Sequence, residues 1–229
     1  MVPSKVRVLG LMFLSFNVLD LTGPCEVFGS NFLPGERSID IASATESCTS
    51  SEGVTVQCTF SFDELLNDTS ALSDYDILLV PGARDDYIDA ALKDDKGLLQ
   101  IIKTFATLEN DGKERWLFSV CTGAAFLAHV GVLSGKTATT HWTYLDKLKE
   151  TCKGAGEEAD IVRKRFVDAG RSKTGVRVVT AVGVSCGMDA ALWIASVVYD
   201  LEQAKGIAKG MDYAWAYAPN DDVTEGWTV

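Results

Sequence analysis

Three short, nearly continuous apolar runs constrain the fold of this 229-residue chain more than any other feature of its sequence. They are VRVLGLMF at 6–13, DILLV at 76–80 and WLFSV at 116–120. Runs of this length are too short for a buried helix and are typical of parallel strands that are covered on both faces. Segments with apolar residues at helical spacing lie between and after them, at 98–108, 124–130, 189–201 and 204–217. The alternation predicts an α/β fold in which helices sandwich a mostly parallel sheet.

The length of the chain is that of one domain, and we interpret residues 1–229 as a single domain because no repeat or low-complexity linker divides them. Hydrophobic residues make up 47% of the chain and charged residues 23%, an ordinary balance for a globular protein. A chain of this size buries a core without disulfides or a structural metal. Two further strands are expected at 161–168 and 176–182.

Acidic residues outnumber basic ones by 32 to 21, which gives a formal net charge of −11. An acidic surface repels phosphate backbones and anionic lipids, so we expect neither nucleic acid nor a membrane as a partner. No run reaches 18 apolar residues, and the first segment has no cleavage site with small residues. These features predict a cytoplasmic protein.

The cysteines show no metal-binding pattern. Six of them are scattered along the chain without a C-x-x-C pair, and there are only two histidines. We therefore expect free thiols in a reducing compartment and no metal site.

Polar or reactive residues follow each of the three apolar runs. They are Asp20 after the first, the segment 81–83 after the second, and Cys121 with Thr122 after the third. In open α/β sheets, ligands bind beyond the carboxyl ends of the strands. The sequence therefore predicts one site built from these three places.

Cys121 is the strongest candidate nucleophile. It stands between a predicted strand and a predicted helix, which is the arrangement of a nucleophile elbow. At a helix start, free amides and the macrodipole favour a thiolate, and Gly123 permits close packing around the turn. The alternative is a cysteine that is buried in the core without a chemical role.

Two other residues have both a chemical and a structural interpretation. Asp20 can act as a general acid and base beside the thiol, or it can cap a helix whose first turn contains Pro24. His141 lies 20 residues after Cys121 and can pair with the thiol, or it can merely position the backbone.

These segments together resemble the ThiJ/PfpI superfamily, whose flavodoxin-like fold is that of class I glutamine amidotransferases. The segments that carry the resemblance are DLTGPCEVF at 20–28, LVPG at 79–82, VCTGA at 120–124, ATTHW at 138–142 and VGVSCGMD at 182–189. Within the superfamily, the first, third and fourth are similar to isonitrile (isocyanide) hydratases. They also occur in the amidotransferase-like half of certain AraC-type regulators, but no helix-turn-helix segment follows here, so we expect no DNA binding.

The resemblance implies the hydration of an isocyanide to an N-substituted formamide through a covalent thioimidate on Cys121. Asp20 would move protons, and Thr122 would orient Asp20 or the attacking water through its hydroxyl. His141 is a secondary candidate. Backbone groups around the site would bind substrate and stabilise negative charge, at Gly82, Ala83, Thr122 and Gly123. No metal or organic cofactor is required, the substrate is a small electrophile, and the resemblance implies a homodimer.

Two alternatives remain open from the sequence. One is a cofactor-independent glyoxalase that converts methylglyoxal to lactate. Glyoxalase-type members commonly carry Glu where Asp20 stands, and the shorter Asp favours the hydratase. The other is a thiol-based stress or redox sensor without turnover. Two departures from the family pattern are Ala83-Arg84, in place of a second glycine, and Cys186, in place of a small apolar residue.

Overall fold

The computed structural model describes residues 5–109, 111–156 and 158–215. Within them, a seven-stranded sheet has the strand order β10-β11-β7-β6-β1-β2-β5. Every neighbouring pair in this sheet is parallel except β10–β11, which is antiparallel. The prediction of a mostly parallel sheet is therefore confirmed. The strands of the main sheet are β1 (Lys5–Leu11), β2 (Glu36–Ser43), β5 (Phe60–Ser61), β6 (Ile77–Val80), β7 (Trp116–Val120), β10 (Phe166–Arg171) and β11 (Arg177–Ala181).

Two short strand pairs lie outside the main sheet, one antiparallel and one parallel. The antiparallel pair is β3 (Ser47–Thr49) with β4 (Thr55–Gln57), and the parallel pair is β8 (Thr137–Ala138) with β9 (Asp160–Ile161).

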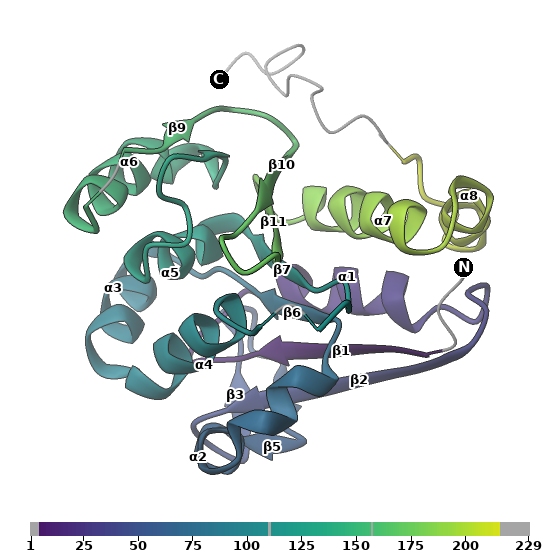
Figure 1. The fold of residues 1–229 in the computed structure, drawn as a ribbon, viewed down its shortest axis with the longest axis horizontal. Helices are drawn as coiled ribbons and strands as arrows, with labels where there is room; N and C mark the ends of the chain where they lie inside the picture. Colours follow the sequence, from purple (N-terminus) through teal and green to yellow (C-terminus); the bar gives the residue numbers. More distant parts are fainter. Residues whose placement is uncertain (1–4, 110, 157, 216–229) are drawn as a thin grey trace.

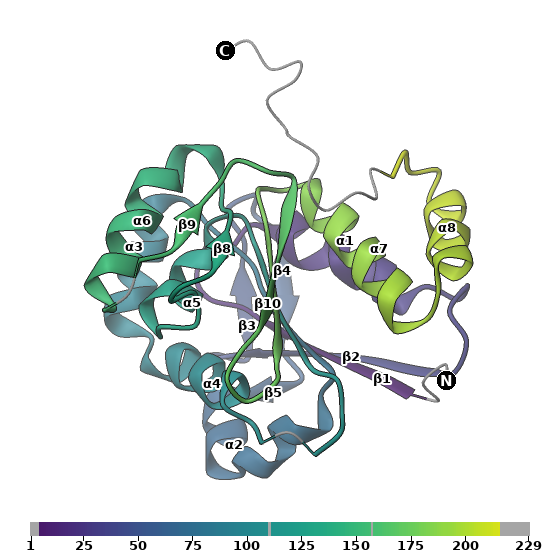
Figure 2. The ribbon, with the colours of Figure 1, turned by 45° about the horizontal axis from the view of Figure 1, so that its top comes forward.

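Helices cover both faces of the main sheet. Figures 1 and 2 show α1, α7 and α8 on one side and α3, α4 and α5 on the other. The helices are α1 (Val18–Gly29), α2 (Phe62–Asn67), α3 (Asp85–Asp94), α4 (Lys96–Ala106), α5 (Ala124–His129), α6 (Leu145–Gly154), α7 (Cys186–Val198) and α8 (Leu201–Gly210). Short 3₁₀ turns occur at η1 (Thr69–Asp74), η2 (Cys121–Gly123) and η3 (Trp142–Tyr144).

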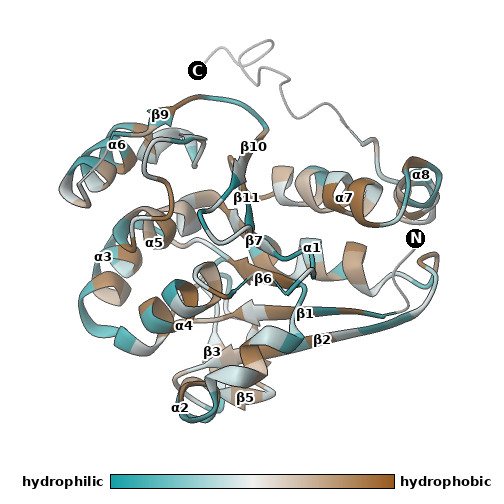
Figure 3. Cartoon of the chain, in the orientation of Figure 1, coloured by the Kyte–Doolittle hydropathy of each residue, from teal (hydrophilic) through white to brown (hydrophobic). Residues whose placement is uncertain are grey.

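The apolar runs form the centre of the core. Every residue of β6 and of β7 is buried, as expected for strands with helices on both faces. Figure 3 shows strongly apolar colouring on α7, which packs against α1 on one side of the sheet. The described residues contain no helix that is long and apolar enough to cross a membrane.

The helix around Pro24 begins earlier than we expected. The structure starts α1 at Val18 and places Pro24 inside the helix rather than in its first turn. The N-cap is Asn17, whose side-chain oxygen accepts the amides of Leu19 and Asp20 at 3.1 Å each. The alternative that Asp20 itself caps the helix is therefore wrong.

Three other expectations change in detail. The strand predicted at 161–168 is divided, because β9 pairs with β8 whereas β10 crosses to β11. The helix predicted at 204–217 is observed as α8, which ends at Gly210; the predicted end at 217 lies outside the described residues. Helix α3 was not predicted, because its sequence DDYIDAALKD has few apolar residues to reveal a period.

Candidate active site

The predicted strand ends meet at one edge of the sheet. Strand β6 pairs in parallel with both β1 and β7, so the segments that follow the three strands emerge side by side. The loops after β1 and β6 also bond to each other, because the amide of Asn17 donates to the carbonyl oxygen of Gly82 at 2.7 Å. This edge holds six of the predicted residues: Asp20, Gly82, Ala83, Cys121, Thr122 and Gly123.

Cys121 occupies a sharp turn between β7 and α5. Its φ angle of 59° is in the left-handed region, which a residue with a side chain rarely adopts and which costs conformational energy. Gly123 lets this turn close against β6, since a Cβ there would lie 2.4 Å from the carbonyl oxygen of Val80. The hydroxyl of Thr140 donates to the carbonyl oxygen of Cys121 at 2.9 Å. The predicted strand–turn–helix arrangement is thus present and is held from two sides.

Asp20 points into the site because another residue caps its helix. Since Asn17 accepts the first amides of α1, the carboxyl of Asp20 is available for contacts beyond the helix. The side chain is fully buried, and its Oδ2 accepts the amide of Gly82 at 3.1 Å. Its Oδ1 is buried and accepts no hydrogen bond within the described part of the chain. One carboxyl oxygen is therefore anchored, and the other is left for chemistry.

Burial controls the protonation of both reactive groups. It raises the pKa of Asp20 to about 7, although the Gly82 amide and the Cys121 thiol stabilise the carboxylate and act to lower that pKa. Burial also raises the pKa of the Cys121 thiol well above its ordinary value, and the neighbouring Asp20 carboxylate raises it further. The backbone and hydroxyl of Thr122 lower the thiol pKa without offsetting these effects. Burial and the nearby carboxylate therefore act against the thiolate that the sequence favours, and α5, whose N-terminus would favour it, is only six residues long.

The contacts of Thr122 differ from those we expected. Its hydroxyl does not orient Asp20; it donates to the carbonyl oxygen of Ala83 at 2.6 Å and accepts the Ala83 amide at 2.9 Å. Two of the amides expected to stabilise negative charge are thus engaged inside the protein, the Gly82 amide by Asp20 and the Ala83 amide by Thr122. A Cβ on Gly82 would lie 2.6 Å from the amide nitrogen of Thr122. These groups hold the site together in the free protein instead of facing a substrate.

His141 lies beside the site without pairing with either reactive group. Its Nδ1 is 2.8 Å from the hydroxyl of Thr143 rather than in contact with Cys121 or Asp20. Burial lowers its pKa, so the ring is mainly neutral at pH 7. The ring lines a cavity of about 190 Å³, and Cys186 lines the same cavity. That His141 is a secondary candidate for a catalytic role remains a prediction.

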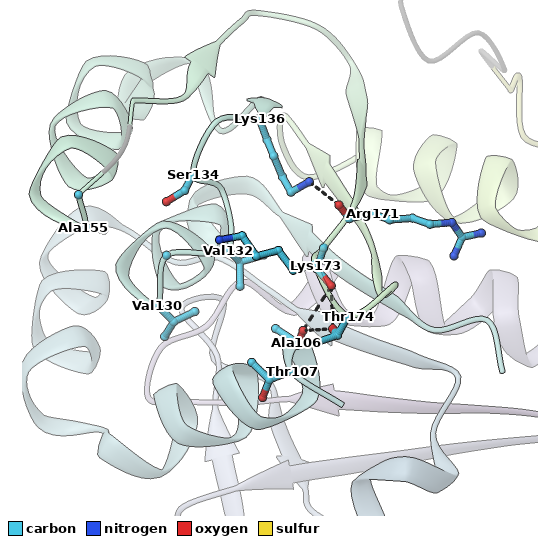
Figure 4. A pocket seen from close by; sticks show the side chains of 13 residues that line it. Ala106, Thr107, Val130, Val132, Ser134, Lys136, Ala155, Arg171, Lys173 and Thr174 are labelled. Atoms are coloured by element: carbon cyan, nitrogen blue, oxygen red, sulfur yellow. Dashed lines mark hydrogen bonds between the residues drawn. The ribbon is translucent and has the colours of Figure 1, made fainter. Parts of the chain in front are cut away.

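Another cavity, shown in Figure 4, has a larger volume and is lined by neither Cys121 nor Asp20. Its volume is about 530 Å³, and it is lined by the turn between β10 and β11 and by residues at the ends of α4, α5 and α6. The ammonium of Lys136 donates to the carbonyl oxygens of Ala169 and Arg171, and the guanidinium of Arg171 pairs with Glu114 at 2.9 Å. These cations are already used within the protein. Among the described residues, no group of three or more His, Cys, Asp or Glu side chains is placed to hold a metal ion.

Three residues of the site were not identified from the sequence as parts of it. Asn17 frees the Asp20 carboxyl, and the signal for it is an Asn followed three residues later by an acid at a helix start. Thr140 holds the carbonyl of Cys121 and lies in the ATTHW segment, where we considered only His141. Glu52 accepts the amide of Val18 at 2.9 Å and acts to raise the pKa of Asp20. No local signal identifies Glu52, because it comes from the turn between β3 and β4.

Comparison with known proteins gives the following matches. The DJ-1/PfpI family model matches residues 6–195. A protein named isonitrile hydratase, from Pseudomonas putida, is 31% identical over 204 residues, which cover 89% of this chain and 77% of the relative. The crystal structure of a ThiJ/PfpI family protein from Pseudomonas syringae has a TM-score of 0.72 at 25% identity, covering 97% of this chain and 79% of that one. Oxidised DJ-1 from Toxoplasma gondii has a TM-score of 0.68 at 22% identity, covering 92% of this chain and 100% of that one, and shows the common fold.

Proposed function

The chain belongs to the DJ-1/PfpI family, and on that premise we propose that it is a cysteine-dependent isocyanide hydratase, which converts R–N≡C to R–NH–CHO. The relative named isonitrile hydratase supports this substrate class, because the match spans most of both chains. Family membership alone does not choose among activities, so the choice depends on the residues at the site.

The observation that carries the proposal is that the Cys121 thiol and the buried Asp20 carboxyl lie close enough for each to shift the pKa of the other. The terminal carbon of an isocyanide must gain a nucleophile and a proton at the same atom. A protonated thiol beside a carboxyl with a pKa of about 7 supplies both from one side near neutral pH. Conversion of methylglyoxal to lactate takes up one water and also needs hydrogen to move between neighbouring carbons, for which this compact pair is less suited.

The first half of the reaction forms the covalent intermediate. Cys121 gives its proton to the Asp20 carboxylate while the sulfur bonds to the terminal carbon. Asp20 then delivers that proton to the same carbon, which gives the thioimidate Cys121–S–CH=N–R. The strained turn keeps the sulfur at the end of β7, within reach of the carboxyl.

The second half releases the product. A water molecule adds across the C=N bond, with Asp20 taking a proton from the water and returning it to the nitrogen. The adduct Cys121–S–CH(OH)–NH–R then breaks its C–S bond, the hydroxyl proton passes to the sulfur, and R–NH–CHO leaves. One water is consumed, and no oxidant or reductant is needed.

The deciding experiment compares two substrates on one preparation of the full chain. We expect loss of a neutral isocyanide with matching formation of its formamide, followed by mass spectrometry, and little loss of methylglyoxal. Cys121→Ala removes the nucleophile and should abolish turnover, whereas Cys58→Ser, at a thiol that bonds to the carbonyl oxygen of Thr45, should retain it. Turnover of methylglyoxal alone would replace the proposal with the glyoxalase, and turnover of neither substrate would favour the sensor.

A further inference from the structure

The smaller cavity, of about 190 Å³, lies next to the strand end that carries Cys121. The last residues of β7 and β11 pair with each other, so Cys121 and Val182 leave adjacent strands at the same level. Thr140 bonds to the carbonyl of Cys121, and the next residue, His141, lines the cavity. A group bound to the Cys121 sulfur therefore has this cavity as neighbouring space.

One of the arginines that line this cavity makes no ion pair with the described residues. Arg165 and Arg163 both line it. The charge of Arg165 is offset, because its guanidinium bonds to the fully buried carboxylate of Asp189. Arg163, by contrast, makes no ion pair in the described part of the chain, and its buried Nε has no hydrogen-bond partner there. None of the described residues that line the cavity is acidic, although the chain as a whole has a net charge of −11.

A helix N-terminus also lies at this cavity. Helix α7 spans 13 residues, and its first residue, Cys186, lines the cavity. Ser185 occupies the N-cap position but makes no side-chain cap bond to the first amides. The N-terminus of a helix carries partial positive charge and binds anions. The first amide of α7 already donates to the carbonyl oxygen of Gly183 at 2.8 Å, and Asp189 lies in the first turn. The cationic group that remains for a ligand in this space is therefore the guanidinium of Arg163, which makes no ion pair with the described residues.

We infer that this cavity binds a carboxylate carried by the substrate, held by Arg163. The inference rests on the proposed function. An isocyanide group is linear, so a terminal carbon at the Cys121 sulfur directs the rest of the molecule away from the sulfur and into the adjoining space. Trp142 and Val182 give the cavity an apolar wall, and its volume admits only a short substituent. The substrate class is therefore a small isocyanocarboxylic acid.

The test compares isocyanoacetate with its methyl ester, which keeps the shape but removes the charge. We expect kcat/KM of the unmodified protein to favour the acid by about 10- to 100-fold, the usual effect of hydrogen bonds to a charged group. Arg163→Gln should lower kcat/KM for the acid by that factor and leave the ester unchanged, and Arg163→Lys should fall between. The matched control is Arg171→Gln, which removes the same charge from an exposed pair with Glu114 outside this cavity and should behave like the unmodified protein.

Other results of this comparison would overturn either the inference or the proposed function. Equal or better turnover of the ester by the unmodified protein overturns the inference, whatever Arg163→Gln does to folding. The inference is also overturned if Arg163→Gln has an unchanged circular dichroism spectrum and loses kcat/KM equally for the acid and the ester. Turnover of neither substrate refutes the proposed function instead. The cavity is then tested by calorimetric binding of N-formylglycine and its methyl ester: tighter binding of the acid that is lost in Arg163→Gln supports the anion site, and its absence overturns it.

Discussion

The hydroxyl of Thr122 bonds to both backbone groups of Ala83, donating to its carbonyl oxygen at 2.6 Å and accepting its amide at 2.9 Å. This two-way contact fixes the turn that carries Cys121 to the loop after β6. The neighbouring amide of Gly82 is then directed at the carboxyl of Asp20. One side chain therefore sets the spacing between the proposed nucleophile and the loop that holds its proton-transfer partner.

Replacing Thr122 with Val should weaken the fold and the activity together. Val has nearly the same shape but leaves the buried amide and carbonyl of Ala83 unpaired, at a cost of about 1–3 kcal/mol in the free energy of unfolding. Urea unfolding measures this loss, and turnover should fall because the loop is no longer fixed. Thr122→Ser keeps the hydroxyl and should stay close to the unmodified protein. A Val variant of full stability would contradict the structural role.

The strain at Cys121 can be measured with two inactive variants. Cys121→Ala keeps a Cβ in the left-handed conformation, whereas Cys121→Gly removes it. We expect the Gly variant to be more stable than the Ala variant by about 1 kcal/mol in urea unfolding. Both lack the sulfur, so the difference isolates the backbone. The opposite order would show that the turn is unstrained.

Gly123 should be intolerant of any side chain. A Cβ there would lie 2.4 Å from the carbonyl oxygen of Val80, so the turn and β6 must separate. Gly123→Ala should lower the free energy of unfolding by about 1–3 kcal/mol, as other forms of overpacking do. The control is Gly154→Ala in α6, where a Cβ meets nothing within 4 Å and helix propensity favours Ala by up to about 1 kcal/mol. Equal stability of the two variants would argue against the close packing of the elbow.

Asp20 should make the protein less stable as the pH rises. Its folded pKa of about 7 lies above the ordinary value of 3.8, so between these values the folded state holds a proton that the unfolded state has lost. The stability contributed by the neutral carboxyl is complete below about pH 4 and is lost as the pH rises through about 7. Asn cannot ionise, so the free energy of unfolding of Asp20→Asn should not show this loss. Relative to the unmodified protein, it should rise by on the order of 4 kcal/mol between pH 4 and pH 8. Urea unfolding at both pH values tests this, and a constant difference would contradict the raised pKa.

Turnover that depends on Asp20 should increase with pH, whereas the stability that Asp20 contributes decreases with pH. The carboxylate must be ionised to take the thiol proton, so kcat/KM for an isocyanide should rise as the pH increases through about 7. Asp20→Asn should reduce turnover by about 10²-fold or more, the usual scale for a positioned proton-transfer group. The pH profile of His141→Ala should still rise through about pH 7, because the imidazole ring bonds to Thr143 and not to Asp20 or Cys121. If His141→Ala removes that rise and Asp20→Asn does not, the histidine is the proton-transfer group.

The sequence was most informative where local pattern and tertiary position agree. The apolar runs of β6 and β7 were read correctly because both faces of these strands are covered. The same runs placed Cys121 and the segment 81–83 at one edge of the sheet. Helix α3 was not predicted because four of its ten residues are aspartate and only Ile88 and Ala91 are buried.

The protonation of the site was beyond sequence reasoning for a physical reason. A helix start next to Cys121 is visible in the sequence, but the burial that raises the pKa of its thiol depends on how the surrounding segments pack around it. The partners of Thr122 and Gly82 were likewise misassigned, because a hydroxyl or amide at a strand end has several acceptors within reach. Which of them it takes depends on sub-ångström packing between distant segments.

The contacts of the site connect parts of the chain that are far apart in sequence, with a separation of 62 positions from Asp20 to Gly82 and of 39 from Ala83 to Thr122. Contacts of such long range close slowly during folding, after local helices have formed. Recovery of turnover in a refolding experiment should therefore lag behind recovery of the far-ultraviolet helical signal. The rate at which turnover recovers then measures how fast β1, β6 and β7 assemble into the site, a step that spectroscopy of secondary structure does not resolve.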